Sequence, residues 1–135
     1  MLKQVEVRPD DFPAIVKAMS QGSAKVRYAG LTLYTPDRPN PDDAVNLNLS
    51  FENGKVGFDW VLLAPRNLED QEKFRAFTRQ HGIELDSRSM NGVHYLRVER
   101  GDIATFITSV VTEMYGRPRD EPLTLVHDGF EWPGA

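Results

Sequence analysis

The sequence contains no cysteine, which excludes disulfide bonds, thiolate nucleophiles and thiolate metal ligands. It also lacks long apolar runs, because the longest, residues 60–64, is far shorter than the roughly 18 residues of a membrane-spanning helix. The first residues alternate charged and apolar side chains, unlike the apolar core of a signal peptide. Acidic residues outnumber basic ones, 20 to 16, whereas a general nucleic-acid binder carries a basic surface. We therefore expect a cytoplasmic protein that binds neither nucleic acid nor membranes.

Motifs for catalysis and for cofactor binding are scarce as well. The chain has neither of the glycine-rich phosphate-binding patterns, no G-x-S-x-G nucleophile turn and no H-E-x-x-H zinc helix. Its three histidines, His81, His94 and His127, fall in separate segments without metal-ligand spacing. His127 precedes Asp128-Gly129, a sequence typical of a turn. We expect no metal and no cofactor.

The chain is rich in alternating apolar and polar residues around two Asn-Gly pairs, which favour tight hairpins because both turn positions need positive φ. A turn at Asn53-Gly54 pairs Leu49 with Phe58 on one face and Asn48 with Asp59 on the other. A one-residue slip would mix the two faces, so the pattern supports this register. The second hairpin turns at Asn91-Gly92. It pairs Ser89 with His94, Arg88 with Tyr95, and Asp86 with Arg97.

Apolar residues at helical spacing predict three amphipathic helices, at about residues 11–21, 68–81 and 103–114. Asn67 and Asp102 precede the second and third helices, where their side chains can accept hydrogen bonds from free backbone N–H groups. Glycines that follow these two helices are expected to end them in the left-handed conformation.

Together these elements predict an α+β fold, with an antiparallel sheet of about five or six strands and three helices packed on one face. The expected element order is β-α-βββ-α-ββ-α-tail. Residues 1–135 are expected to form a single α+β domain, with residues 117–135 as a C-terminal arm packed on it. Within that segment, residues 122–132 are expected either to add a short strand or to pack as an arm.

This order of elements, from about Asp11 to Gly116, resembles the fold of type III secretion chaperones and the related YbjN-like proteins. The resemblance is one of element order and composition, without a shared sequence motif. It implies a small, acidic, cytoplasmic homodimer that holds a partner polypeptide without catalysis.

The sheet face that no helix covers is expected to be polar, with mixed charge. Such a face is either an ordinary solvated surface or a recognition platform or dimer surface. We predict a non-catalytic protein-binding module, chaperone-like or an immunity-type adaptor, with a protein partner and a homodimeric state. The candidate binding residues are Asn46, Asn48, Asp59, Glu84, Asp86, Arg88, Tyr95 and Arg97.

The alternative prediction is a small enzyme or ligand-binding domain. A serine beside a histidine can act as a nucleophile when a carboxylate supports the pair, and the second hairpin places Ser89 opposite His94. Glu84 and Asp86 would lie roughly 7 Å apart on one strand face, which suits general acid–base chemistry. A partly buried, hydrogen-bonded histidine and ordinary ion pairs explain the same residues without catalysis.

Overall fold

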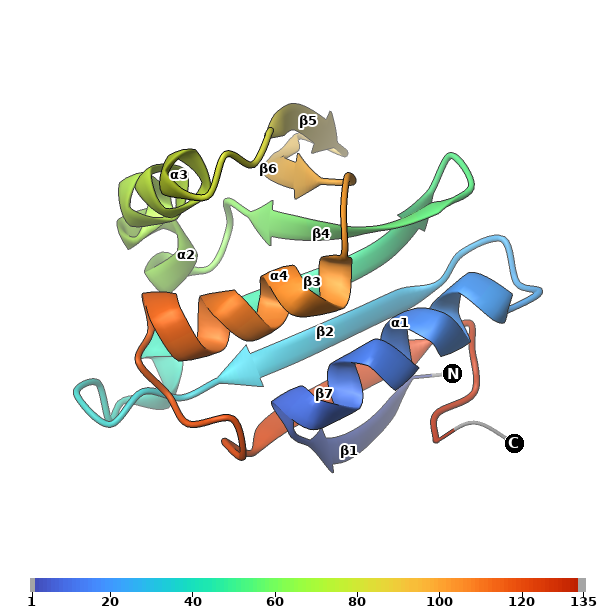
Figure 1. Cartoon of the computed structure of the whole chain (residues 1–135), viewed down its shortest axis with the longest axis horizontal. Helices are drawn as coiled ribbons and strands as arrows, with labels where there is room; N and C mark the ends of the chain where they lie inside the picture. The colour runs from blue at the N-terminus through green and yellow to red at the C-terminus, as the bar shows by residue number, and fades with distance from the viewer. Residues whose placement is uncertain (1, 134–135) are drawn as a thin grey trace.

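The computed structural model describes residues 2–133, which contain one seven-stranded antiparallel sheet with helices packed on one face (Figure 1). From one edge to the other, the strand order is β1-β7-β2-β3-β4-β6-β5. The strands are β1 Lys3–Val7, β2 Tyr28–Leu33, β3 Val45–Glu52, β4 Lys55–Val61, β5 Asp86–Met90, β6 Val93–Val98 and β7 Leu123–Asp128. The predicted α+β class is therefore confirmed.

Helix α1 (Phe12–Gln21) follows β1 along the chain. Helices α2 (Pro65–Glu69) and α3 (Gln71–Gln80) follow β4, and helix α4 (Ile103–Ser109) follows β6. Helix α4 continues as a π-helical turn over Val110–Met114, and α1 and α4 lie side by side over the sheet (Figure 1). No helix among residues 2–133 is both long enough and apolar enough to cross a membrane.

Aromatic side chains form the centre of the core between the sheet and the helices. Trp60 stacks on Phe74 of α3 with their ring centroids 4.5 Å apart. Phe58 packs edge-on against Phe106 of α4, at 5.4 Å. All of these side chains are buried, so α3 and α4 cover the apolar face of the sheet that the sequence predicts.

Both hairpins form at the predicted turns. Asn53 and Gly54 have φ values of 52° and 78°, and Asn91 and Gly92 have values of 53° and 81°, as a two-residue turn of this kind requires. The confirmed pairs are Phe51–Val56, Ser50–Gly57, Leu49–Phe58 and Asn48–Asp59 in the first hairpin, and Ser89–His94, Arg88–Tyr95, Ser87–Leu96 and Asp86–Arg97 in the second. Local turn chemistry and side-chain alternation thus determine the register of four of the seven strands.

The helix predicted over residues 68–81 is two helices, and Asn67 does not cap it. Pro65 at the first helical position starts α2 earlier, so Asn67 lies inside α2, fully buried. Its side-chain amide accepts a hydrogen bond from the Asn46 N–H and donates one to the Asn46 carbonyl, both at 2.9 Å. The ladder between β3 and β4 ends at the Asn48–Asp59 pair, so the Asn67 amide takes the place of a strand beside Asn46.

We expect Asn67→Ala to lower the free energy of unfolding by about 2 kcal/mol, because it leaves the Asn46 N–H and carbonyl without their partner. The matched control is Asn46→Ala, which leaves those backbone groups and the Asn67 amide in place and should change stability by less than about 0.5 kcal/mol. Urea denaturation measures both variants. Equal midpoints for Asn67→Ala and the wild type would contradict this role.

The sheet has seven strands, rather than five or six, because the predicted tail supplies β7. Within β7, Leu123, Leu125 and His127 are buried while the residues between them are partly exposed. This strand pairs with β1 on one side and β2 on the other. Residues 123–128 therefore form an interior strand of the sheet, which is the first of the two expectations for this segment.

His127 is also not in a turn, because it lies in β7 with its side chain 1% exposed. Its Nδ1 atom is buried without a hydrogen-bond partner among the described residues, and its ring packs against Phe130 with centroids 5.1 Å apart. Burial lowers the pKa of His127 below its ordinary value. The folded protein therefore resists protonation at this position.

This burial predicts a pH-dependent stability. Since the folded pKa of His127 is lowered, the unfolded chain binds the proton more readily, and the free energy of unfolding falls as the pH drops through the ordinary histidine pKa. The loss is at most about 1.4 kcal/mol per pH unit and ends below the folded pKa. His127→Gln should remove this slope, whereas His94→Gln, at an exposed histidine, should retain it. Denaturation midpoints between about pH 7.5 and pH 5 test the prediction, and an unchanged slope in His127→Gln would contradict it.

Candidate binding surface

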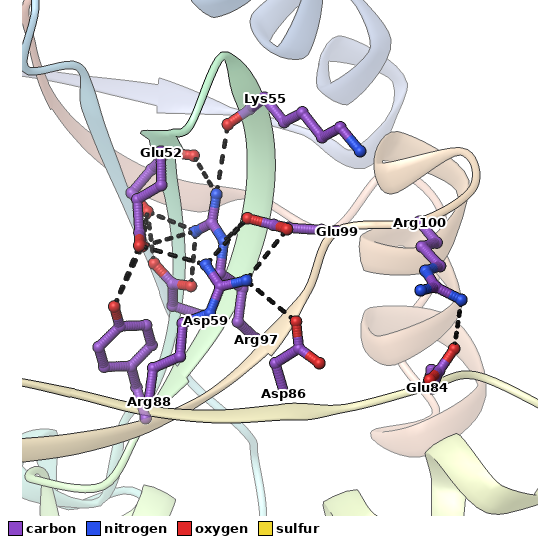
Figure 2. A network of polar contacts seen from close by, with 11 residues as sticks. Glu52, Lys55, Asp59, Glu84, Asp86, Arg88, Arg97, Glu99 and Arg100 are labelled. Carbon is purple, nitrogen blue, oxygen red and sulfur yellow. Dashed lines mark hydrogen bonds and ion pairs between the residues drawn. The ribbon is translucent and has the colours of Figure 1, made fainter.

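The face of the sheet opposite the helices, which we call the open face, carries an ionic network centred on Arg97 of β6 (Figure 2). The Arg97 side chain is 0% exposed, and all three of its nitrogens donate hydrogen bonds. Nε donates to Glu99 at 2.7 Å, and Nη1 donates to Asp59 at 2.8 Å. Nη2 donates to the backbone carbonyls of Ser50 and Lys55, each at 3.3 Å. The guanidinium is thus fixed in one orientation.

A glycine makes room for this guanidinium. Gly57 lies opposite Ser50 in the hairpin of β3 and β4, and a Cβ atom added to it would lie 2.5 Å from the Arg97 Cζ. A side chain at position 57 would therefore require the Arg97 guanidinium to move from this place. Arg97 comes from the neighbouring strand, so this close contact also joins the two hairpins.

A second guanidinium, that of Arg88 in β5, completes the network. Arg88 makes two hydrogen bonds to Glu99, at 3.0 and 3.1 Å, and further contacts to Asp86 and Glu52 at 3.0 and 3.3 Å. The Tyr95 hydroxyl lies 3.2 Å from both Glu52 oxygens. The network therefore joins side chains from β3, β4, β5 and β6 with that of Glu99, which follows β6. The carboxylates of Glu52, Asp59, Asp86 and Glu99 surround the two guanidiniums.

The environment fixes the charges in this network. Burial raises the pKa of Asp59, although its hydrogen bonds act in the opposite direction. Hydrogen bonds from Arg88 and then Arg97 lower the pKa of Glu99 to about 2. Burial raises the pKa of Tyr95, which keeps its hydroxyl protonated. Each oxygen of Glu52, Asp59 and Glu99 already accepts a hydrogen bond or ion pair from within the chain, so the network is a rigid platform.

Two hollows flank this platform on the open face. The Met90 hollow, of about 470 Å³, includes Val26, Met90 and Val93 in its lining, with Glu52 and Asp59 on its polar side. The Leu63 hollow, of about 440 Å³, is lined within residues 2–133 by uncharged side chains only, among them Leu2, Leu63 and Val126. Tyr28 and Val61 line both hollows and therefore lie between them.

The exposed apolar side chains of the described residues are concentrated here. Seven large apolar side chains are exposed, and five of them line the two hollows. These five are Leu2 at 62%, Val26 at 79%, Tyr28 at 36%, Leu63 at 66% and Met90 at 59% exposure. Scattered apolar residues are normal on a protein surface, but a continuous group marks an interaction site.

The structure brings together five of the eight candidate binding residues in one network, namely Asp59, Asp86, Arg88, Tyr95 and Arg97. Asn46 and Asn48 lie on the same face but line the Leu63 hollow, and Asn48 accepts a hydrogen bond from the Tyr28 hydroxyl at 3.2 Å. Glu84 is outside the network. It precedes β5 and pairs with the exposed Arg100 at 2.6 Å, well apart from the other residues (Figure 2).

The residues of the alternative enzyme prediction do not form a site of this kind. Ser89 and His94 are opposite each other as predicted, but both are exposed and neither lines either hollow. Asp86 is paired with Arg88, and Glu84 is paired with Arg100, so the two carboxylates have different ion-pair partners. No cluster of three or more potential metal-binding side chains is found among residues 2–133.

The sequence did not identify Glu52 and Glu99 as members of the network. It also did not identify Met90 as one of the exposed apolar side chains that line the hollows. Each of these residues lies an even number of positions from an identified residue, and therefore on the same face of the strand. Glu52 follows Asn48 by four residues, and Glu99 follows Arg97 by two. Continuing the alternation two steps from Asn48 and one step from Arg97 would have found both carboxylates.

Comparison of the chain with protein-family models, with curated proteins and with solved structures finds no match.

Proposed function

We propose that this protein is a non-catalytic protein-binding module, of the adaptor or chaperone-like kind, and that the open face is its binding surface. The observation that carries the proposal is the gathering of exposed apolar side chains along the Met90 and Leu63 hollows. An exposed apolar surface of this kind costs free energy in water, and that cost is removed when another polypeptide covers it.

The ionic network supports this function by making the surface rigid. Its charged groups are satisfied within the chain, so a partner need not supply a counter-charge for each of them. Rigid surfaces lose less conformational entropy on binding than flexible ones do. The network therefore ties together strands β4 and β5, which carry Val61 and Met90.

Site-specific photo-cross-linking tests the proposal. A benzophenone amino acid is placed at Tyr28 or Met90 on the open face, and at Ala14, an exposed position in α1, as the matched control. We expect discrete protein adducts from the two open-face positions, identified by mass spectrometry, and none from Ala14. Competition by untagged wild-type protein should abolish these adducts, while the Val61→Arg variant should not compete. Equal adduct formation from all three positions would refute the proposal.

A further inference from the structure

We propose that a cavity beside His127, on the helical side of the sheet, binds a small aromatic molecule that carries a hydroxyl group. This cavity, which we call the His127 cavity, has a volume of about 660 Å³ and is lined by residues of α1, β1 and β7 and of the segments that follow α1 and β7. Its volume is within the usual range for small-molecule sites, roughly 300–1,000 Å³. The open face is on the other side of the sheet, so the inference is independent of the proposed function.

The register of the sheet determines which side chains form the floor of the cavity. His127 belongs to the buried side of β7, which faces the helices. Its partner in β1 is Lys3, so these two side chains are neighbours on the same side of the sheet. Ala18 and Gln21 line the cavity from α1. Helix α1 lies over β1 and β7, and the segment after β7 passes beside the C-terminal end of the helix (Figure 1).

Two glycines bring the loop walls of the cavity together. Gly22 follows the last residue of α1, and a Cβ atom added to it would lie 3.3 Å from the Gly129 carbonyl oxygen. Gly129 has a φ of 88°, and a Cβ atom at this position would collide with the backbone of Val26. The residues after α1 and those after β7 are therefore in direct backbone contact. They form a wall that is present before a ligand binds, as is usual for small-molecule sites.

The feature that points to a ligand is the unpartnered nitrogen of His127. The residue is 1% exposed and lines the cavity, but its Nδ1 atom has no hydrogen-bond partner among the described residues. Such an atom costs free energy, and a ligand that supplies the missing hydrogen bond recovers it. Burial lowers the pKa of His127, so at neutral pH the ring is uncharged and Nδ1 either donates or accepts, according to the tautomer. A hydroxyl group suits both tautomers because it can donate and accept.

The neighbouring side chains suit the aromatic part of such a ligand. The Phe130 ring packs against the imidazole of His127 with centroids 5.1 Å apart, and both rings line the cavity together with the methyl group of Ala18. Aromatic rings pack favourably on one another at such distances. Because Nδ1 is shielded from solvent, binding includes a small rotation of the imidazole or of the Phe130 ring toward the cavity. Phe130 lies in the segment after β7, outside the strands.

The charged side chains around the cavity do not require a charged ligand. Lys3 Nζ and a carboxylate oxygen of Glu131 are 3.6 Å apart, and their side chains are 55% and 76% exposed. These two charges thus lie at the mouth of the cavity and offset each other. Asp128 follows His127 in β7, so its side chain is directed to the opposite side of the sheet. The interior of the cavity therefore depends on the imidazole for its polar contact.

A nuclear magnetic resonance titration of the isotope-labelled protein with p-cresol and with toluene tests the inference. We expect p-cresol to shift the resonances of the lining residues and of the His127 ring nitrogens, with a dissociation constant of about 1–5 mM, which is ordinary for so small a molecule. Toluene, which lacks the hydroxyl group, should bind about 5-fold more weakly. His127→Phe retains an aromatic ring but no hydrogen-bonding atom, so p-cresol and toluene should bind this variant equally.

A matched pair of substitutions in α1 tests the location independently of His127. Ala18→Phe fills the cavity from the helix and should abolish the binding of p-cresol. Ala14→Phe lies one turn earlier, at an exposed position outside the cavity, and should bind p-cresol as the wild type does. Circular dichroism confirms that each variant is folded, and this pair decides the location even if His127→Phe does not fold.

Three results would overturn the inference. The first is the absence of shifts at the lining residues with about 10 mM p-cresol, as expected if the cavity holds water only. The second is unchanged p-cresol binding in Ala18→Phe, and the third is a preference for p-cresol over toluene that persists in His127→Phe. None of these results concerns the open face, which the cross-linking tests separately.

Discussion

Replacement of Arg97 by methionine is expected to lower the free energy of unfolding by about 3–5 kcal/mol, the usual consequence of removing one partner from a buried ion pair. Methionine retains much of the volume of the arginine side chain, so the cost arises from electrostatics rather than from a cavity. Asp59, which is 9% exposed, loses its cation, and Glu99 loses its shortest hydrogen bond. Urea denaturation near pH 7 measures the effect.

Two comparisons separate this cause from a general disturbance of the sheet. Arg97→Lys retains a positive charge but cannot make all the hydrogen bonds of the planar guanidinium, so it should recover only part of the loss. Arg100→Met removes the same kind of side chain from an exposed ion pair with Glu84 and should cost less than about 1 kcal/mol. Equal effects of Arg97→Met and Arg100→Met would show that the network does not stabilise the fold.

The difference between the wild type and Arg97→Met should become smaller in acid. In the wild type, Arg88 and Arg97 lower the pKa of Glu99 to about 2, so their stabilising effect is present at neutral pH and is lost as the pH falls from the ordinary value toward 2. In the variant, the buried Asp59 no longer has its cation, which raises the pKa of Asp59 further. Protonation of Asp59 therefore stabilises the variant as the pH falls.

Gly57→Ala should have the second-largest effect, a loss of about 1–3 kcal/mol, which is typical of overpacking a well-filled site. The backbone of Gly57 has no positive φ, so alanine is compatible with the strand itself. In a strand, replacing glycine with alanine ordinarily stabilises by roughly 0.5–1 kcal/mol. The expected loss arises because the new Cβ would displace the Arg97 guanidinium.

A double-mutant cycle tests this explanation directly. In an Arg97→Met background, where no guanidinium lies over Gly57, the same Gly57→Ala substitution should be neutral or stabilising. A change of sign between the two backgrounds is the expected result and requires that the two positions interact. If Gly57→Ala destabilises both backgrounds equally, the close contact with Arg97 is not the cause.

The hairpins could be predicted from the sequence because their determinants are local. Asn53-Gly54 and Asn91-Gly92 fix the turns, and the alternation of side chains beside them fixes the register. Five of the network residues follow from that register, because pairs such as Asp86–Arg97 are direct consequences of it. The resemblance to secretion chaperones and YbjN-like proteins, in contrast, remains a prediction.

The remaining features depend on contacts between distant segments. Strand β7 pairs with residues more than ninety positions away in the sequence, and six alternating residues near the end of a chain do not show which strands they join. The role of Asn67 depends on where the β3–β4 ladder ends, since its amide replaces a missing strand beside Asn46. The hollows likewise combine side chains from most of the strands, so composition alone gave no sign of them.

The position of β7 also bears on the order in which the sheet can assemble during synthesis. Among residues 2–133, β1 precedes the other six strands in the sequence, but its neighbour in the sheet is β7, the last of the seven to be synthesised. While the chain is still being translated, the edge of β2 that β7 will occupy is open and β1 has no place to pair. Strand β1 therefore cannot take its place in this sheet until the residues up to Asp128 have been synthesised.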